Sequence, residues 1–156
     1  MKYEDVNQEV IRVINKVLEK HFEPILENNV VIKAFFVNER SKSNGKVVLA
    51  KISKASDRIK YFTQEDAVDG CDYVLDIDKK AWKLADEEDR VRLIRHELRH
   101  IDLSLKRDGS LRMGIAPHDF EDFRTEVELN DGNVDWANRL AFLVDTEYDQ
   151  EKELAD

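Results

Sequence analysis

Four stretches of the chain carry apolar residues three or four positions apart, a spacing that places them on one face of an α-helix. The first helix is expected to end near His21, within an N-terminal segment of residues 1–28. The second begins with a run of carboxylates, where a helix N-terminus favours negative charge, and we expect it to stop at Gly109. Residues 145–156 are acidic and are expected to fray. The predicted helices cover residues 6–21, 86–105, 118–127 and 134–144.

Three further segments have the composition of β-strands. Residues 30–37 are almost entirely apolar, which predicts a strand buried on both faces. A polar turn at residues 41–46 separates this strand from residues 47–52, and we expect the two strands to form a hairpin. Residues 73–77 form the third, with apolar side chains on one face. The predicted fold class is therefore α+β, one domain of residues 1–156 in which a small, mostly antiparallel sheet packs on helices.

The composition limits the classes of function. The chain has 156 residues and a net charge of −9, so we expect an acidic surface that does not bind nucleic acid through phosphate contacts. Cys71 is the only cysteine, which excludes an internal disulfide and favours a reducing compartment. No apolar run reaches the roughly 18 residues of a membrane span, and the N-terminus lacks a signal-peptide profile. We therefore expect a cytoplasmic protein without a membrane partner.

The most specific chemical signal is the segment His-Glu-Leu-Arg-His, which contains His96, Glu97 and His100. Four residues of α-helix advance about 6 Å and rotate about 40° past one turn, so both imidazoles project from one face and can bind one metal ion. A carboxylate directly after the first histidine lies within reach of a metal-bound water. Zinc lowers the pKa of such water toward about 7, and Glu97 can then act as its base. The segment predicts a zinc-dependent hydrolase whose motif lies in the middle of the helix of residues 86–105.

A catalytic zinc site needs a third protein ligand and leaves its fourth position to water. His118 is the leading candidate, because imidazole is the commonest protein ligand and this residue stands at the start of the next predicted helix. Zinc also accepts carboxylates, and those of the same helix are the alternatives: Glu121, Asp122, Glu126 and Glu128. Asp102 and Asp119 each follow a candidate ligand closely. Each either accepts the second N–H of a ligand imidazole or remains a solvated surface acid.

The order of these segments resembles the phage metallopeptidase family, a group of small zincin-like proteins of phages and prophages. The resemblance extends from Val30 to Phe142 and rests on residues 72–78, 81–82, 96–100 and 117–120. It implies a zincin-like domain with the motif on a central helix, and Zn²⁺ as cofactor. By the same resemblance, Glu97 is the catalytic base, and the zinc ligands are His96, His100 and His118. The expected reaction is hydrolysis of peptide bonds in a peptide or protein substrate, in the host-cell cytoplasm for a phage-encoded protein.

In zincin-like folds a strand beside the motif helix lies at the edge of the sheet, where an extended peptide can pair with its backbone. By resemblance, residues 73–78 are the candidate strand, with Tyr73 and Leu75 as substrate-binding residues; the alternative is an ordinary amphipathic strand. Arg112 and Tyr73 are candidate donors to the oxyanion. The chain departs from the zincin pattern at Arg99, since the residues between the glutamate and the second histidine are usually uncharged. This side chain either pairs with a carboxylate, orients substrate or points to solvent.

Two other functions agree with the same residues. The three histidines can form a structural zinc site in a protein that acts by binding a partner protein, and a fourth ligand such as Glu121 or Asp122 would favour it. The second alternative is metal-dependent hydrolysis of another bond, such as an RNA phosphodiester. It ranks last, because RNA requires a basic cleft and acidic residues surround His118 in the sequence.

Overall fold

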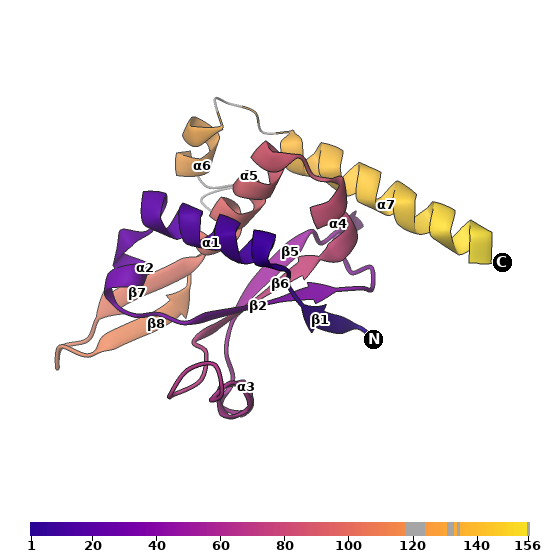
Figure 1. The fold of residues 1–156 in the computed structure, drawn as a ribbon. Helices are drawn as coiled ribbons and strands as arrows, with labels where there is room; N and C mark the ends of the chain where they lie inside the picture. The colour runs from indigo at the N-terminus through magenta and orange to yellow at the C-terminus, as the bar shows by residue number, and fades with distance from the viewer. Residues whose placement is uncertain (118–123, 131–132, 134, 156) are drawn as a thin grey trace.

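A mixed sheet of four strands forms the centre of the fold (Figure 1). The computed structural model describes residues 1–117, 124–130, 133 and 135–155. β6 pairs in parallel with β2 and antiparallel with β5, so neighbouring strands occupy both edges of β6. The strands lie in the order β1-β2-β6-β5, with the respective bounds Tyr3–Asp5, Ile32–Val37, Tyr73–Asp78 and Ala50–Lys54.

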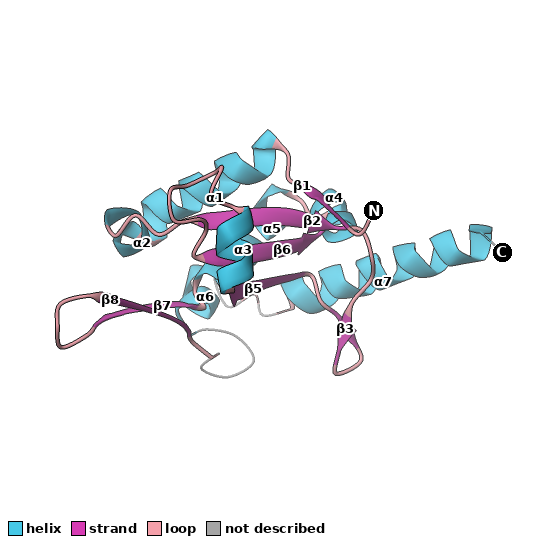
Figure 2. Ribbon diagram, turned by 90° about the horizontal axis from the view of Figure 1, so that it is seen from below, coloured by secondary structure: helices cyan, strands magenta, loops and turns pink. Residues whose placement is uncertain are grey.

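Helices cover both faces of this sheet. α1, α4 and α5 lie on one face and α3 on the other, while the hairpin β7–β8 extends to one side (Figures 1 and 2). The helices are α1 (Gln8–His21), α2 (Glu23–Glu27), α3 (Asp57–Phe62), α4 (Lys79–Leu84), α5 (Glu87–Leu98), α6 (Arg124–Leu129) and α7 (Trp136–Ala155). The short strand pairs are β3–β4 (Lys42–Ser43, Lys46–Val47) and β7–β8 (Ile101–Leu105, Leu111–Ile115).

The core between α5 and the sheet is apolar and closed. Leu75 and Ile77 of β6 and Ile94 and Leu98 of α5 are all 0% exposed. Asp86 caps α5, because its side chain accepts a hydrogen bond from a backbone amide of the first turn at 2.8 Å. The predicted α+β class, the first helix and the acidic start of the motif helix are confirmed. No helix within the described ranges has the length and apolar composition needed to cross a membrane.

The predicted hairpin between residues 30–37 and 47–52 is wrong. The corresponding strands, β2 and β5, lie on opposite sides of β6, which occurs later in the chain. The polar turn forms its own small hairpin, β3–β4, with Asn44 and Gly45 at φ angles of 52° and 78°. Two apolar strands joined by a turn are expected to pair only when no later strand competes. Here the core-facing residues of β6 are 0% exposed, and the strand pairs with a neighbour along each of its edges.

The motif helix ends earlier than the sequence predicts. α5 stops at Leu98 with Arg99 as its C-cap, and the hairpin β7–β8 replaces the expected last turns. Residues 101–105 alternate apolar and polar side chains, which is the pattern of a strand. Ile101 and Leu105 are also four positions apart, which is the spacing of one helix face, so the pattern fits both structures equally. Gly109, at a φ of 85°, belongs to the hairpin turn and is no helix stop. His100 therefore lies just beyond the helix.

The acidic C-terminal segment is helical, since α7 continues to Ala155, the last described residue. Arg40 binds two of its carboxylates, Asp145 at 2.6 Å and Asp149 at 2.8 Å. The hydroxyl of Tyr148 donates to Oδ2 of the buried Asp78 at 2.7 Å. These contacts attach α7 to the end of β6. The periodicity of the sequence can predict the helix but cannot predict its contacts with distant residues.

Tyr148→Phe tests this attachment. Asp78 is 4% exposed, and its Oδ1 accepts a hydrogen bond from the Ala81 amide at 2.9 Å, so loss of the hydroxyl removes a donor from a buried carboxylate. We expect the free energy of unfolding, measured by urea titration, to fall by about 1–3 kcal/mol. Tyr61→Phe is the control, because Tyr61 is 68% exposed and its loss should change stability by less than about 0.5 kcal/mol. Equal stability of Tyr148→Phe and wild type would contradict the role given to this hydroxyl.

Candidate active site

His96 and His100 lie side by side at the C-terminal end of α5. Their ring centroids are 5.5 Å apart, and the ring planes meet at 72°. His96 belongs to the last turn of the helix, whereas His100 follows the C-cap. The backbone tightens between them, since the His100 amide donates to the carbonyl of Glu97 at 3.1 Å. This turn keeps the second imidazole next to the first although the helix has ended.

A backbone carbonyl sets the orientation of the His100 ring. Its Nδ1 lies 2.7 Å from the carbonyl oxygen of Ala116, just after β8. Because a carbonyl oxygen only accepts, Nδ1 carries the proton and Nε2 keeps the lone pair that a metal ligand requires. Burial lowers the pKa of His100, which favours this neutral form. The acceptor at Nδ1 is thus a carbonyl, where the sequence suggested Asp102, an exposed residue of β7.

Glu97 is buried between α5 and β5. Its side chain is 8% exposed and accepts a hydrogen bond from the Ile52 backbone amide. Burial raises the pKa of Glu97 to about 7, against the opposing effects of the nearby His96 and of the Ile52 amide. A carboxylate that titrates near neutrality is suited to take up and release a proton during a reaction.

The outer edge of β5 lies next to these residues. The Ala55 amide and the Leu49 carbonyl form hydrogen bonds of 2.9 Å with the chain of β6. Such bonds alternate along an antiparallel pair, so Ala50, Ile52 and Lys54 direct their amides and carbonyls to the opposite edge. Within the part of the chain that the structure describes, no strand pairs with that edge. The β5 edge, defined by these three residues, therefore offers backbone groups beside Glu97.

An open cavity of about 550 Å³ joins the β5 edge to the motif. Its lining comes from residues 41–43, 48 and 50–52, from Ile115 at the end of β8, and from three residues of the motif: His96, Glu97 and His100. A polypeptide segment that followed the β5 edge would therefore pass directly in front of the histidine pair.

The substrate-binding residues predicted in β6 do not line this cavity. Tyr73 and Leu75 are both 0% exposed and β6 is an interior strand, so the prediction of an edge strand at residues 73–78 is wrong. The Tyr73 hydroxyl donates to the Gly114 carbonyl at 2.7 Å and holds β8 against the sheet. Arg112 is exposed on β8. Alternation of apolar and polar residues identified a strand but could not distinguish an edge from an interior position.

The third metal ligand stays a prediction. His118, Asp119, Glu121 and Asp122 lie outside the described residues. Among the residues that are described, no three His, Cys, Asp or Glu side chains form a group that could hold a metal ion. The histidine pair therefore supplies two donors, and any further protein ligand has to come from elsewhere.

Glu126, a candidate ligand by sequence, is the charge partner of two arginines. It is 1% exposed, and its Oε1 and Oε2 accept hydrogen bonds from Arg95 Nε at 2.9 Å and from a terminal nitrogen of Arg99 at 3.0 Å. Arg99 thus pairs with a carboxylate, one of the three roles considered for it. Glu128 is exposed on α6. In the sequence, the two arginines are four positions apart, as the two histidines are. Nothing in the sequence indicated that Arg99 would bind Glu126, 27 residues away.

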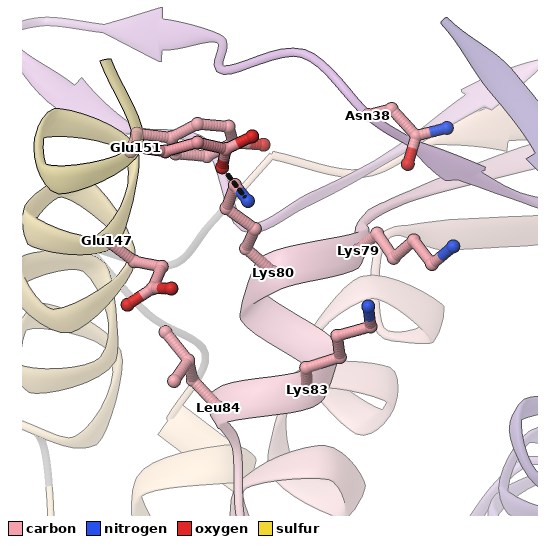
Figure 3. A pocket seen from close by; sticks show the side chains of 8 residues that line it. Asn38, Lys79, Lys80, Lys83, Leu84, Glu147 and Glu151 are labelled. Atoms are coloured by element: carbon pink, nitrogen blue, oxygen red, sulfur yellow. Dashed lines mark ion pairs between the residues drawn. The ribbon is translucent and has the colours of Figure 1, made fainter. Parts of the chain in front are cut away.

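A second pocket, between α4 and α7, contains no residue of the motif (Figure 3). Its volume is about 320 Å³, and lysines of α4 line it together with Glu147 and Glu151 of α7. Lys80 pairs with Glu151, and Lys79 pairs with Glu4. Carboxylates of the protein therefore neutralise much of the positive charge of this pocket. Because the pocket also contains no residue of the motif, it is not the candidate site.

A mixed α+β fold with a His-Glu-Leu-Arg-His segment beside an open sheet edge is typical of the metallopeptidase class of proteins. A family model described as Putative phage metallopeptidase matches residues 1–146, and the chain belongs to that family. The match includes the region from Val30 to Phe142 on which the resemblance rested and extends it to the N-terminus. Membership implies a metal ion and a protein or peptide substrate. Searches of curated proteins and of solved structures gave no match.

The pH dependence of stability in the metal-free protein tests the burial of Glu97. Folding raises the pKa of this carboxyl from 4.5 to about 7, so the folded state binds the proton more tightly than the unfolded state does. The stability that it contributes is fully present below the unfolded pKa and is lost as the pH rises through the folded one. In chelator-treated protein at about pH 8, we expect Glu97→Gln to exceed wild type in stability by about 3 kcal/mol.

The exposed Glu87, in the first turn of the same helix, provides the control. Glu87→Gln should retain the wild-type dependence of stability on pH. A stability difference between Glu97→Gln and wild type that stays constant from acidic to alkaline pH would contradict the burial assigned to Glu97.

Proposed function

We propose that the protein is a zinc-dependent peptidase that hydrolyses peptide bonds with an activated water molecule. One observation carries the proposal: the buried Glu97 lines the same open cavity as the His96–His100 pair and the β5 edge. A general base, a pair of metal donors and a backbone edge for an extended chain are the parts that such a reaction needs.

The donors present suit zinc, which binds imidazole nitrogens in tetrahedral sites. His96, His100 and His118 would hold the ion, and the Ala116 carbonyl would keep His100 in the tautomer that presents Nε2. When bound, zinc supplies a Lewis acid that polarises the scissile carbonyl and makes water acidic enough to react at neutral pH. Glu97 takes the proton from the attacking water and then gives it to the leaving amine.

The substrate strand is assigned to the β5 edge in place of β6. The Ile52 amide is already used by Glu97, so an extended peptide would pair with the remaining outward backbone groups of Ala50, Ile52 and Lys54. Pairing of this kind fixes the path of the main chain. It would carry the scissile bond past Glu97 without requiring a particular side chain in the substrate.

A non-catalytic zinc site is the less favoured alternative, because it would need a fourth protein ligand. The candidates named for that ligand, Glu121 and Asp122, lie outside the described residues, and Glu126 is committed to Arg95 and Arg99. The cavity in front of the histidine pair is open, which supports a site that admits a water molecule and a substrate.

The metal content of the purified chain tests the ligand assignment. We expect about one zinc ion per chain by plasma mass spectrometry, because three imidazoles make a high-affinity site. His96→Ala, His100→Ala and His118→Ala should each lose most of the bound zinc. His21→Ala is the matched control, since His21 is the remaining histidine and ends α1, and it should keep the wild-type content. Full zinc content in His118→Ala would exclude that residue as a ligand.

Glu97→Gln separates catalysis from metal binding. The amide cannot accept the water proton, so we expect zinc to stay bound while the rate of peptide hydrolysis falls by about 10²–10⁴-fold. The rate is followed with a quenched-fluorescent peptide library, and Glu87→Gln on the same helix should cleave at the wild-type rate. Unchanged turnover in Glu97→Gln would refute the mechanism.

A further inference from the structure

A buried cluster of charged side chains braces the turn that carries the histidine pair. Glu126 of α6 is 1% exposed and accepts hydrogen bonds from Arg95 and from Arg99 of α5, at 2.9 and 3.0 Å. Asn130 also accepts from Arg95, which is itself 8% exposed. The Arg99 guanidinium lies 4.5 Å from the ring centroid of Phe22. Each arginine is therefore fixed by more than one neighbour.

The two arginines lie in the same turn of the helix as the two histidines, and each arginine directly precedes one histidine in the sequence. Arg95 and Arg99 are four positions apart, as are His96 and His100. This is the turn in which the helix ends: the Arg99 amide still bonds to the Arg95 carbonyl at 3.0 Å, whereas the His100 amide bonds to Glu97 three residues back. Beyond this point the helix ladder no longer fixes the backbone that carries the second imidazole.

We propose that Glu126 is a positioning residue for the His96–His100 pair. By binding both arginines at once, it fixes the length and direction of the last turn of α5, and so the separation of the two imidazoles. The proposal rests on the metal-binding role of the pair given under the proposed function. A buried ion cluster is weak evidence for a gain in stability, because removing charges from water is costly. Its value here is geometric: it holds one backbone arrangement where the helix provides little restraint.

Asp89 offers a matched control on the same helix. It is 5% exposed and binds two arginines, Arg92 at 2.8 Å and Arg139 at 3.1 Å. Glu126 and Asp89 are thus both buried carboxylates that hold two arginines each. Asp89 lies in the first turn of α5, at the opposite end from the histidines. A general loss of stability would affect both variants, whereas a loss of metal geometry should affect one of them.

The test compares Glu126→Gln and Asp89→Asn with wild type by titration with Co²⁺, followed by visible absorption. Gln keeps the size of Glu126 but turns one acceptor into an N–H donor that faces an arginine. We expect Co²⁺ affinity to fall about 10–100-fold in Glu126→Gln, with a changed absorption spectrum. Asp89→Asn should keep the wild-type affinity and spectrum, although urea denaturation should show that both variants are less stable.

Arg99→Met provides a second variant if Glu126→Gln does not fold, because it leaves Glu126 paired with Arg95 and removes only one arm of the brace. We expect the same change of spectrum with a smaller loss of affinity. Wild-type Co²⁺ affinity and spectrum in the folded Glu126 or Arg99 variant would overturn the positioning role and leave the proposed function intact. An equal loss in Asp89→Asn would also overturn it. Absence of Co²⁺ binding by the wild type would overturn the proposed function itself.

Discussion

The packing of the last turn of α5 against β5 is the contact on which the site depends. The Glu97 carboxylate accepts a hydrogen bond from the Ile52 amide, a backbone group that β5 directs away from β6. That amide is available only because β6 occupies the centre of the sheet and leaves β5 at its edge. The order of the strands therefore decides that Glu97, the histidine pair and an open backbone edge share one cavity.

The region around the motif contains more buried charge than a core built for stability would need. Glu97, Arg95 and Glu126 are each at most 8% exposed, close to fully apolar residues such as Leu98. Burying these groups costs free energy that only specific partners offset. The arginines find theirs in Glu126, whereas burial raises the pKa of Glu97 to about 7 despite the opposing effects of His96 and of the Ile52 amide. This difference separates the groups that hold the site from the group that can exchange a proton.

Local patterns in the sequence predicted the parts of the fold that local interactions decide. The spacing of apolar residues gave the first helix, and the carboxylates before the motif marked the start of α5. The end of α5 was missed, because residues 101–105 fit a helix and a strand equally and Gly109 suits either a helix stop or a hairpin turn. Strand order was missed for another reason. It depends on which strand buries most in the centre, and that is a property of the whole sheet.

The same distinction applies to the site. The candidate histidine pair and Glu97 could be named from the sequence alone, because their spacing is typical of a metal-binding histidine pair with a neighbouring base. The β5 edge and the Ala116 carbonyl were not foreseen, and Glu126 was considered as a metal ligand but not as the partner of two arginines, because these roles come from contacts across the fold that no motif marks. X-ray absorption at the zinc edge, on the full chain with one equivalent of zinc, tests the central claim most directly. We predict a shell of nitrogen and oxygen at about 2.0–2.1 Å with imidazole scattering. A sulfur shell at about 2.3 Å, or zinc that remains hydrated in solution, would contradict it.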